Sequence, residues 1–130
     1  LSRLVGSEMC IRDRLYLVYP QGNYIRPADS KPYLVIGEVK YGKPILDRVI
    51  TPKVSIGDAS RCALISMDST LKSDLTVGPP IDFAVIKKDE IKIASLKCLN
   101  MNDPEFSKVC NQWSQGIFKI FDSFQRFDWE

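Results

Sequence analysis

The sequence predicts an α+β domain in which helices lie against a mixed or antiparallel sheet. The patterns along the chain run hairpin, strand, two helices, two strands and one long helix. Two consecutive helices between strands do not fit a doubly wound parallel sheet, in which single helices alternate with strands, so we expect helices layered against a mixed or antiparallel sheet. A length of 130 residues fits a single domain.

The composition is typical of a soluble globular domain. Hydrophobic residues make up 45% of the chain and charged residues 26%, and no apolar run is long enough for a membrane-spanning helix. A net charge of +2 argues for neither a nucleic-acid partner nor an acidic surface as partner. We therefore expect no nucleic acid and no membrane among the partners.

The chain contains no histidine, which removes Ser-His-Asp and Cys-His triads and histidine-based metal sites from this segment. Of four cysteines, Cys62, Cys98 and Cys110 lie beyond the first 14 residues, and none belongs to a Cys-x-x-Cys pair. We interpret these three as buried thiols in a reducing cytoplasm, with a disulfide or a catalytic thiol as alternatives. We expect no cofactor and no metal.

The first 14 residues look foreign to the rest of the chain. Leu4 to Asp13 reads like one frame of a transposon-end adapter used in sequencing libraries, and a genuine polar N-terminal arm is the alternative. We therefore expect residues 1–14 to be an adapter-derived artefact and leave them out of the fold prediction. Residues 15–130 then begin inside a strand-like run, so we expect a front half to be missing.

A hairpin and a buried strand are predicted next. Leu15–Tyr19 and Tyr24-Ile25 are the two strands of the hairpin. Pro20–Asn23 is its turn, because proline presets φ while glycine and asparagine tolerate positive φ. Tyr33–Ile36 reads as a buried strand that ends at Gly37.

Two helices follow this strand. The first is predicted within Val39–Ile50 and starts near Lys43, because Pro44 is tolerated in a first turn. The second opens at Ser55, which resembles the start of a capping box with Asp58, and ends around Lys72. Its apolar stripe is Ile56, Ala59, Ala63, Met67 and Leu71, with Asp58, Arg61 and Asp68 off the stripe.

The last part of the chain predicts two strands and a long helix. Ile81–Lys87 reads as a strand buried on both faces, and Glu90–Leu96 as an alternating strand with Ile91, Ile93 and Ser95 on one face. Asp103 as N-cap and Pro104 at the first position open the helix. Its stripe is interpreted as core packing, with a subunit contact as the alternative: Phe106, Val109, Cys110, Trp113, Ile117, Ile120, Phe121 and Phe124.

Several phrases resemble the proteasome β-subunit family. Leu17–Gly22 loosely matches its Tyr-x-x-Asp-Pro-x-Gly hairpin, Ile36–Gly42 takes the place of its Gly-Ser-Gly turn, and Asp74–Gly78 takes the place of its Asp-x-x-Ser-Gly motif. Three longer phrases look like the Anbu branch, the bacterial proteasome-related peptidases: Tyr-Pro-Gln-Gly-Asn, Ile-Gly-Glu-x-Lys-Tyr-Gly-Lys-Pro-Ile-Leu-Asp-Arg and Val-Gly-Pro-Pro-Ile-Asp. The likeness runs from about Leu15 to Phe124.

The resemblance implies an αββα sandwich of the N-terminal-nucleophile hydrolase type, incomplete here because the front half is missing. It implies hydrolysis of peptide bonds by an N-terminal threonine whose free α-amino group acts as base, so that no histidine is needed. The nucleophile and the lysine and aspartate that assist it belong to the missing half. The resemblance further implies a peptide or protein substrate and self-association into a ring or open-ring oligomer.

The residues that the resemblance assigns to the site have supporting roles only. Asp74 stands at the position of the family aspartate that supports the nucleophile. Val77 replaces the family serine, and Thr76 offers a hydroxyl from the next position. Glu38 stands where the family has the serine of its glycine turn. The alternatives are a helix-end or turn aspartate for Asp74 and a helix-start carboxylate for Glu38.

Three hypotheses follow for the function. The first is the C-terminal part of a proteasome-related threonine peptidase, and the second is a non-catalytic, ring-forming structural subunit of the same fold. The third is an unrelated small binding domain that exposes the aromatic stripe of its last helix and is a stable monomer. We expect instead that the chain exposes sheet edges and apolar faces.

Overall fold

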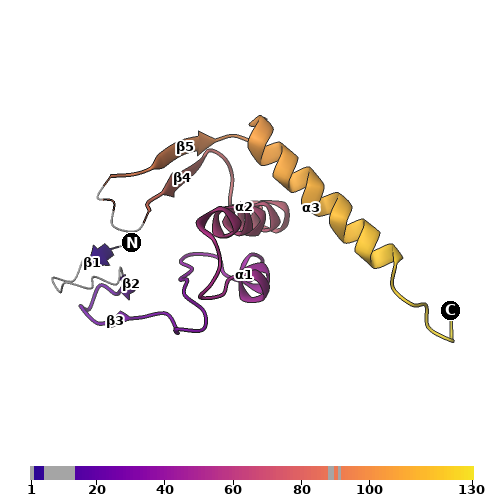
Figure 1. Cartoon of the computed structure of the whole chain (residues 1–130), viewed down its shortest axis with the longest axis horizontal. Helices are drawn as coiled ribbons and strands as arrows, with labels where there is room; N and C mark the ends of the chain where they lie inside the picture. Colours follow the sequence, from indigo (N-terminus) through magenta and orange to yellow (C-terminus); the bar gives the residue numbers. More distant parts are fainter. Residues whose placement is uncertain (1, 5–13, 88–89, 91) are drawn as a thin grey trace.

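A computed structural model describes residues 2–4, 14–87, 90 and 92–130 of the chain. In chain order its elements are β1 (Ser2–Leu4), β2 (Arg14–Val18), β3 (Tyr24–Ile25), α1 (Lys43–Val49), α2 (Ile56–Ser73), β4 (Ile81–Val85), β5 (Ser95–Leu99) and α3 (Pro104–Asp122). The predicted α+β class is confirmed. Figure 1 shows the strands on one side of α1 and α2, while α3 extends from the end of β5 away from the rest of the chain.

The described residues form two small antiparallel sheets. In the first, β2 lies between β1 and β3, and Val18 pairs with Tyr24 across the predicted hairpin. The turn is closed by the Tyr19 amide, which donates to the Asn23 carbonyl at 2.9 Å, and Gly22 has the positive φ of 87° that favours glycine. β1 belongs to the segment 1–14, whose foreign origin stays a prediction.

The strand predicted at Tyr33–Ile36 is wrong. These residues run as an irregular, largely half-buried segment, and Ile36 is exposed. A strand requires a neighbouring backbone to complete its hydrogen bonds, and within the described part of the chain no strand pairs with this segment. Side chains hold it in place instead, as shown below for Tyr33.

Both central helices begin where the sequence predicts. α1 starts at Lys43 with Pro44 in its first turn. α2 is capped by Ser55, whose hydroxyl accepts from the Asp58 amide at 3.0 Å. Asp68, which lies off the apolar stripe, is nevertheless buried, because only 2% of its surface is exposed. It faces α3 and is satisfied there by the Lys72 ammonium at 2.8 Å.

β4 and β5 pair antiparallel, with Ile81 opposite Leu99 and Val85 opposite Ser95. The prediction that the first strand is buried on both faces is wrong, because among its five residues only Ile81 is buried. The second strand starts five residues later than predicted, because a longer connection precedes it. Of the residues predicted on one face, Ile91 lies outside the described residues, and Ile93 precedes the strand. Other elements cover the β4–β5 hairpin on one face only. Cys98 is therefore exposed, which corrects the expectation of a buried thiol.

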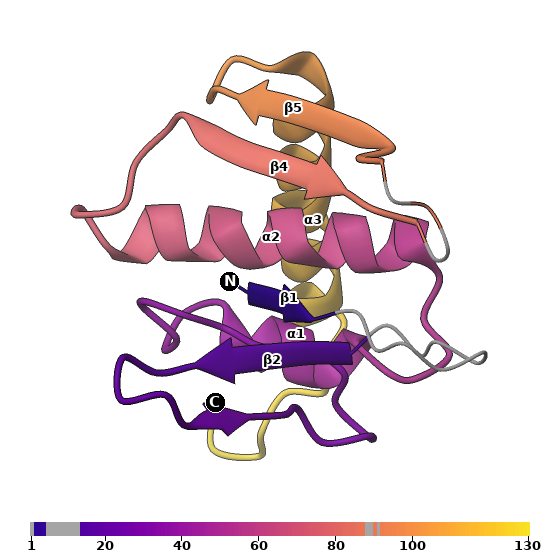
Figure 2. The same cartoon turned by 90° about the vertical axis from the view of Figure 1, so that its left-hand side faces the viewer.

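The core lies where β4, β5 and α3 meet α2. Its buried residues are Ile81, Leu99, Phe106 and Cys110, and partly buried side chains pack around them: Leu64, Met67, Leu71 and Phe83. Figure 2 shows the β4–β5 hairpin along one side of α2 and the other sheet along the opposite side. None of the described helices is both long and apolar enough to cross a membrane.

The stripe of α3 is buried only in its first half. Phe106 and Cys110 belong to the core, which confirms core packing there. From Ile117 to Phe124 the same stripe is exposed, so that the core-packing interpretation is wrong for this half. The reason is length: the helix has 19 residues, about 28 Å at 1.5 Å per residue, and runs past the core that it covers.

Candidate functional site

The turn that carries Glu38 is built on a left-handed glycine. Gly37 has a φ of 81°, a conformation that residues with a Cβ rarely adopt. The Glu38 carboxylate folds back and accepts from the Lys40 amide at 2.9 Å. α1 begins only at Lys43, so the interpretation of Glu38 as a helix-start carboxylate is wrong. The carboxylate shapes its own turn instead.

The end of this turn lies directly against α2. A Cβ added to Gly42 would meet the Ser66 carbonyl at 2.9 Å and the Thr70 hydroxyl at 3.2 Å. Both distances are shorter than ordinary contacts, so that glycine is required for the chain to pass so close to the helix. This contact sets the distance between the Glu38 turn and the C-terminal half of α2.

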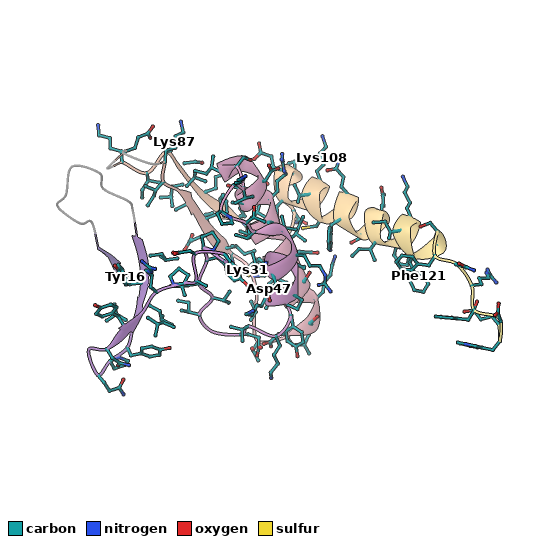
Figure 3. The ribbon with its side chains drawn as sticks, turned by 60° about the horizontal axis from the view of Figure 1, so that its bottom comes forward. Tyr16, Lys31, Asp47, Lys87, Lys108 and Phe121 are labelled. Atoms are coloured by element: carbon teal, nitrogen blue, oxygen red, sulfur yellow. The ribbon has the colours of Figure 1, made fainter. Side chains whose placement is uncertain are left out.

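A polar cluster around Asp47 stabilises the segment that precedes the Glu38 turn. The Asp47 carboxylate accepts from the Tyr33 hydroxyl and, at 2.6 Å, from the Lys43 ammonium, while the Lys31 ammonium donates to the Asp47 backbone carbonyl. Figure 3 shows Lys31 and Asp47 side by side. The hydrogen bonds from Lys43 and then Tyr33 lower the pKa of Asp47. The cluster thus fastens the segment before the turn to α1, which follows the turn.

Burial and then the hydrogen bond to Asp47 raise the pKa of Tyr33. Both effects favour the neutral phenol, which donates, over the phenolate. Since the carboxylate stays charged and the phenol stays neutral, the donor and the acceptor are matched at neutral pH. The cluster is therefore a stable support for the turn.

Asp74 ends α2 and forms a turn of its own. It is the C-cap of the helix, and its amide donates to the Thr70 carbonyl at 2.8 Å. Its Oδ1 accepts from the Thr76 amide at 2.9 Å and from the Thr76 hydroxyl at 2.7 Å. These two bonds, the one from the hydroxyl first, lower the pKa of Asp74, and the Lys40 charge lowers it further. Asp74 is thus a helix-end turn aspartate in its geometry.

Lys40 links the two predicted carboxylates. Its backbone amide is held by Glu38, and its positive charge stabilises the ionised form of Asp74. Two turns that are more than thirty positions apart in the sequence, 38–40 and 74–76, thus lie near each other, because Gly42 packs against Thr70 close to the end of α2. Sequence reasoning missed Lys40. The signal that could have found it is its position as a cation within the same glycine turn that carries Glu38.

The charged carboxylates of this arrangement can orient a polar group that binds to them. Ionised carboxylates accept hydrogen bonds from an ammonium group, a hydroxyl or a water. Glu38 is half-buried and Thr76 exposed, so the two turns face solvent rather than the core. Among the described residues, no three His, Cys, Asp or Glu side chains gather to hold a metal ion.

An apolar cleft of about 380 Å³ adjoins the Glu38 turn. One wall is the segment 32–36, and the other is formed by α1, α2 and the loop between them. Ile36, the last residue of the first wall, precedes Gly37, and Ser66 on the opposite wall faces Gly42. The cleft therefore extends from the candidate site along the side of the two helices. Its lining includes Tyr33, Val35, Leu46, Ile50, Ala59 and Ala63.

The chain matches no protein-family model and no curated protein, but it is similar to several solved structures. It is 40% identical to a Gly-1 mutant of Anbu from Hyphomicrobium sp. strain MC1, with a TM-score of 0.84 over 89% of this chain and 51% of that chain. It is also 40% identical to Anbu (ancestral beta-subunit) from Yersinia bercovieri. The TM-score is 0.85, and the match covers 89% of this chain and 49% of that chain.

A third similar structure is a helical assembly of the Anbu complex from Pseudomonas aeruginosa. The identity is again 40%, the TM-score is 0.82, and 88% of this chain and 48% of that chain are covered. The chain thus spans about half the length of each of these relatives. Because both sequence and structure agree over nearly nine tenths of this chain, the likeness extends well beyond a shared fold.

Proposed function

Since this chain belongs to the Anbu family over the half of those proteins that it matches, we propose that it is part of a proteasome-related threonine peptidase that hydrolyses peptide bonds. The observation that supports this most is the close approach of Gly42 to Ser66 and Thr70, which brings the Glu38 turn near the end of α2 that carries Asp74. These are the two turns at which the resemblance to proteasome β subunits predicts supporting residues. The attacking threonine and its assisting lysine and aspartate are proposed to lie in the half that this chain does not span.

The proposed role of Asp74 is to orient the α-ammonium group of the nucleophile or a water. Only Oδ1 is engaged by Thr76, so the second oxygen is available to a group brought by the other half. Thr76 holds the carboxylate in one orientation and keeps it ionised. The charge of Lys40, in the Glu38 turn, adds a smaller stabilisation of the ionised carboxylate. This is positioning, because no reacting atom lies in this chain.

The proposed fold of the whole protein is an αββα sandwich of the N-terminal-nucleophile hydrolases. In it, α1, α2 and α3 form an outer helical layer. We propose that residues 15–130 are the C-terminal part of this single domain and that residues 1–14 are adapter-derived. A cytoplasmic location is proposed because the three described cysteines are free thiols.

The test begins with the sequence that precedes residue 15 in the gene. We expect a mature N-terminal threonine and, on early strands, an aspartate and a lysine. The complete protein should hydrolyse a fluorogenic peptide, and replacing its first residue should abolish this activity. A mature N-terminus other than Thr, Ser or Cys would refute the peptidase proposal.

The Asp74→Asn variant of the complete protein tests the supporting role. We expect a loss in turnover of about 100-fold, the lower end of the range for groups that control proton transfer. Asp29→Asn is the matched control, since Asp29 is an exposed loop carboxylate that pairs, among the residues that the structure describes, with Arg26 at 3.3 Å. Equal activity of the two variants would remove Asp74 from the mechanism.

A second candidate function is a ring-forming structural subunit of the same fold without catalysis. Val77 at the place of the family serine favours it, because an isopropyl group cannot donate the hydrogen bond of a hydroxyl. This candidate predicts self-association of the complete protein without hydrolysis of any peptide. The same assay therefore separates the two functions.

A further inference from the structure

The second half of α3 and the tail after it carry a row of exposed aromatic side chains. Phe118, Phe121 and Phe124 are 70%, 69% and 63% exposed, and in the tail Phe127 and Trp129 are 64% and 79% exposed. At about 200 Å² for each aromatic side chain, they expose on the order of 700 Å² of largely apolar surface. The largest apolar patch of a typical monomer is about 300–600 Å², so this surface exceeds what a monomer leaves uncovered.

The arrangement of the row is that of a helix face prepared for a partner. Ile117, Ile120, Phe121 and Phe124 continue the stripe that Phe106 begins, and in Figure 3 Phe121 lies on the part of α3 that projects beyond the other elements. No residue of the stripe is charged. Two copies of this face can therefore meet without bringing like charges together.

A glycine at the edge of the stripe is the second, independent observation. Gly116 lies in the interior of α3, where glycine is less favourable than alanine. On the helix surface it sits between Trp113 and Ile120, three residues before and four residues after it. Among the described residues, nothing lies within 4 Å of a Cβ built on Gly116. Packing within this chain therefore does not account for the missing side chain, whereas close approach of another helix does.

We infer that α3 packs through this face against α3 of a second copy, with Gly116 close to the point where the helices cross. The inference rests on the self-association that the family resemblance implies, and it assigns that association to the exposed face of α3. The exposed aromatic area of about 700 Å² belongs to α3 and the tail together, so an interface of standard size, in which each partner buries roughly 800 Å², would include the tail as well as the α3 face. A similar structure is described as a helical assembly of the Anbu complex, which favours a second copy over an unrelated protein.

Gly116→Leu tests the inference on the complete protein, including the half that this chain does not span. Leucine is a better helix former than glycine, so the variant keeps α3 helical while its side chain blocks close approach. Gln115→Leu is the matched control: it adds the same side chain at the next position, on the opposite face of the helix. Sedimentation velocity over a concentration series measures the association of the three proteins.

We expect the unmodified chain and Gln115→Leu to associate equally, and Gly116→Leu to raise the dissociation constant by about tenfold or more. Equal association of all three proteins would overturn the α3 interface but leave self-association standing. An unmodified chain that stays monomeric throughout the series would overturn both. Neither result bears on peptide hydrolysis, which is measured separately.

Discussion

Thr76 donates two hydrogen bonds to one carboxylate oxygen of Asp74, from its hydroxyl at 2.7 Å and from its amide at 2.9 Å. Together with the Lys40 charge, these bonds lower the pKa of Asp74. The end of α2 therefore carries a negative charge of fixed orientation at neutral pH. The turn that Glu38 shapes lies near this end of α2, because Gly42 packs against Thr70, although the two turns come from distant parts of the sequence.

Removing the Thr76 hydroxyl should raise the pKa of Asp74. We expect Thr76→Val to shift it toward the ordinary value of about 3.9, because the largest of the stabilising bonds is lost. Thr76→Ser, which keeps a hydroxyl, should leave it low. NMR titration of the Asp74 side-chain carboxyl carbon measures the shift, and identical titration of the valine and serine variants would contradict the assignment.

The Asp47 cluster should make stability sensitive to acid. The folded pKa of Asp47 lies below its unfolded value, so its contribution is present above the unfolded pKa, about 3.9, and is lost as pH falls through the folded pKa. Asp47→Asn should weaken this pH dependence and speed hydrogen exchange in residues 31–36. Asp29→Asn should do neither. Unfolding by urea at several acidic pH values, with exchange followed by mass spectrometry, measures both effects.

Gly42→Ala should destabilise the contact between the Glu38 turn and α2. The added methyl group meets the Ser66 carbonyl at 2.9 Å, and we expect a loss of about 1–3 kcal/mol in the free energy of unfolding. Gly57→Ala is the control, because its nearest contact is the Ser55 hydroxyl at 3.9 Å and alanine favours the helix by up to about 1 kcal/mol. Thermal unfolding that ranks the two variants in the opposite order would refute the close approach.

Cys110 should resist alkylation while Cys98 reacts. Burial, followed by the neighbouring Asp68 charge, raises the pKa of the Cys110 thiol from 9.0 to about 11, whereas Cys98 is exposed. A raised pKa stabilises the folded chain below the unfolded value of the thiol, and this contribution is lost as pH rises toward 11. Labelling with iodoacetamide over a pH series, read by mass spectrometry, should modify Cys98 first and Cys110 only at high pH. Equal labelling rates at pH 8 would contradict this.

Local signals predicted the helices well. Pro44 and the pair Ser55 and Asp58 marked two helix starts, and Asp103 with Pro104 marked the third, because a cap or a first-turn proline acts within a few residues. The hairpin at Gly22 was predicted for the same reason. Strands that depend on distant partners were predicted less well: 33–36 is not a strand, and β5 begins later than its alternating pattern indicates.

The candidate site was predicted only in part. Glu38, Asp74 and Thr76 were named from the resemblance, and their roles stay proposals. That the Lys40 charge acts on Asp74 could not be predicted from the glycine turn alone, since it depends on how closely Gly42 approaches α2. The burial of Asp68 was missed because helical periodicity locates one apolar face, while α3 covers a second face of α2.

The sequence by itself determined where the helices begin, the α+β class and the likeness to the Anbu proteins, because each of these depends on residues that are neighbours in the chain. The tertiary structure decided which faces are covered. It buried Asp68, exposed Cys98, brought Lys40 to Asp74 and left the second half of the α3 stripe open. The physical reason is that burial and electrostatic contact depend on which elements meet in space, and the spacing of residues within one helix or strand does not specify its partner.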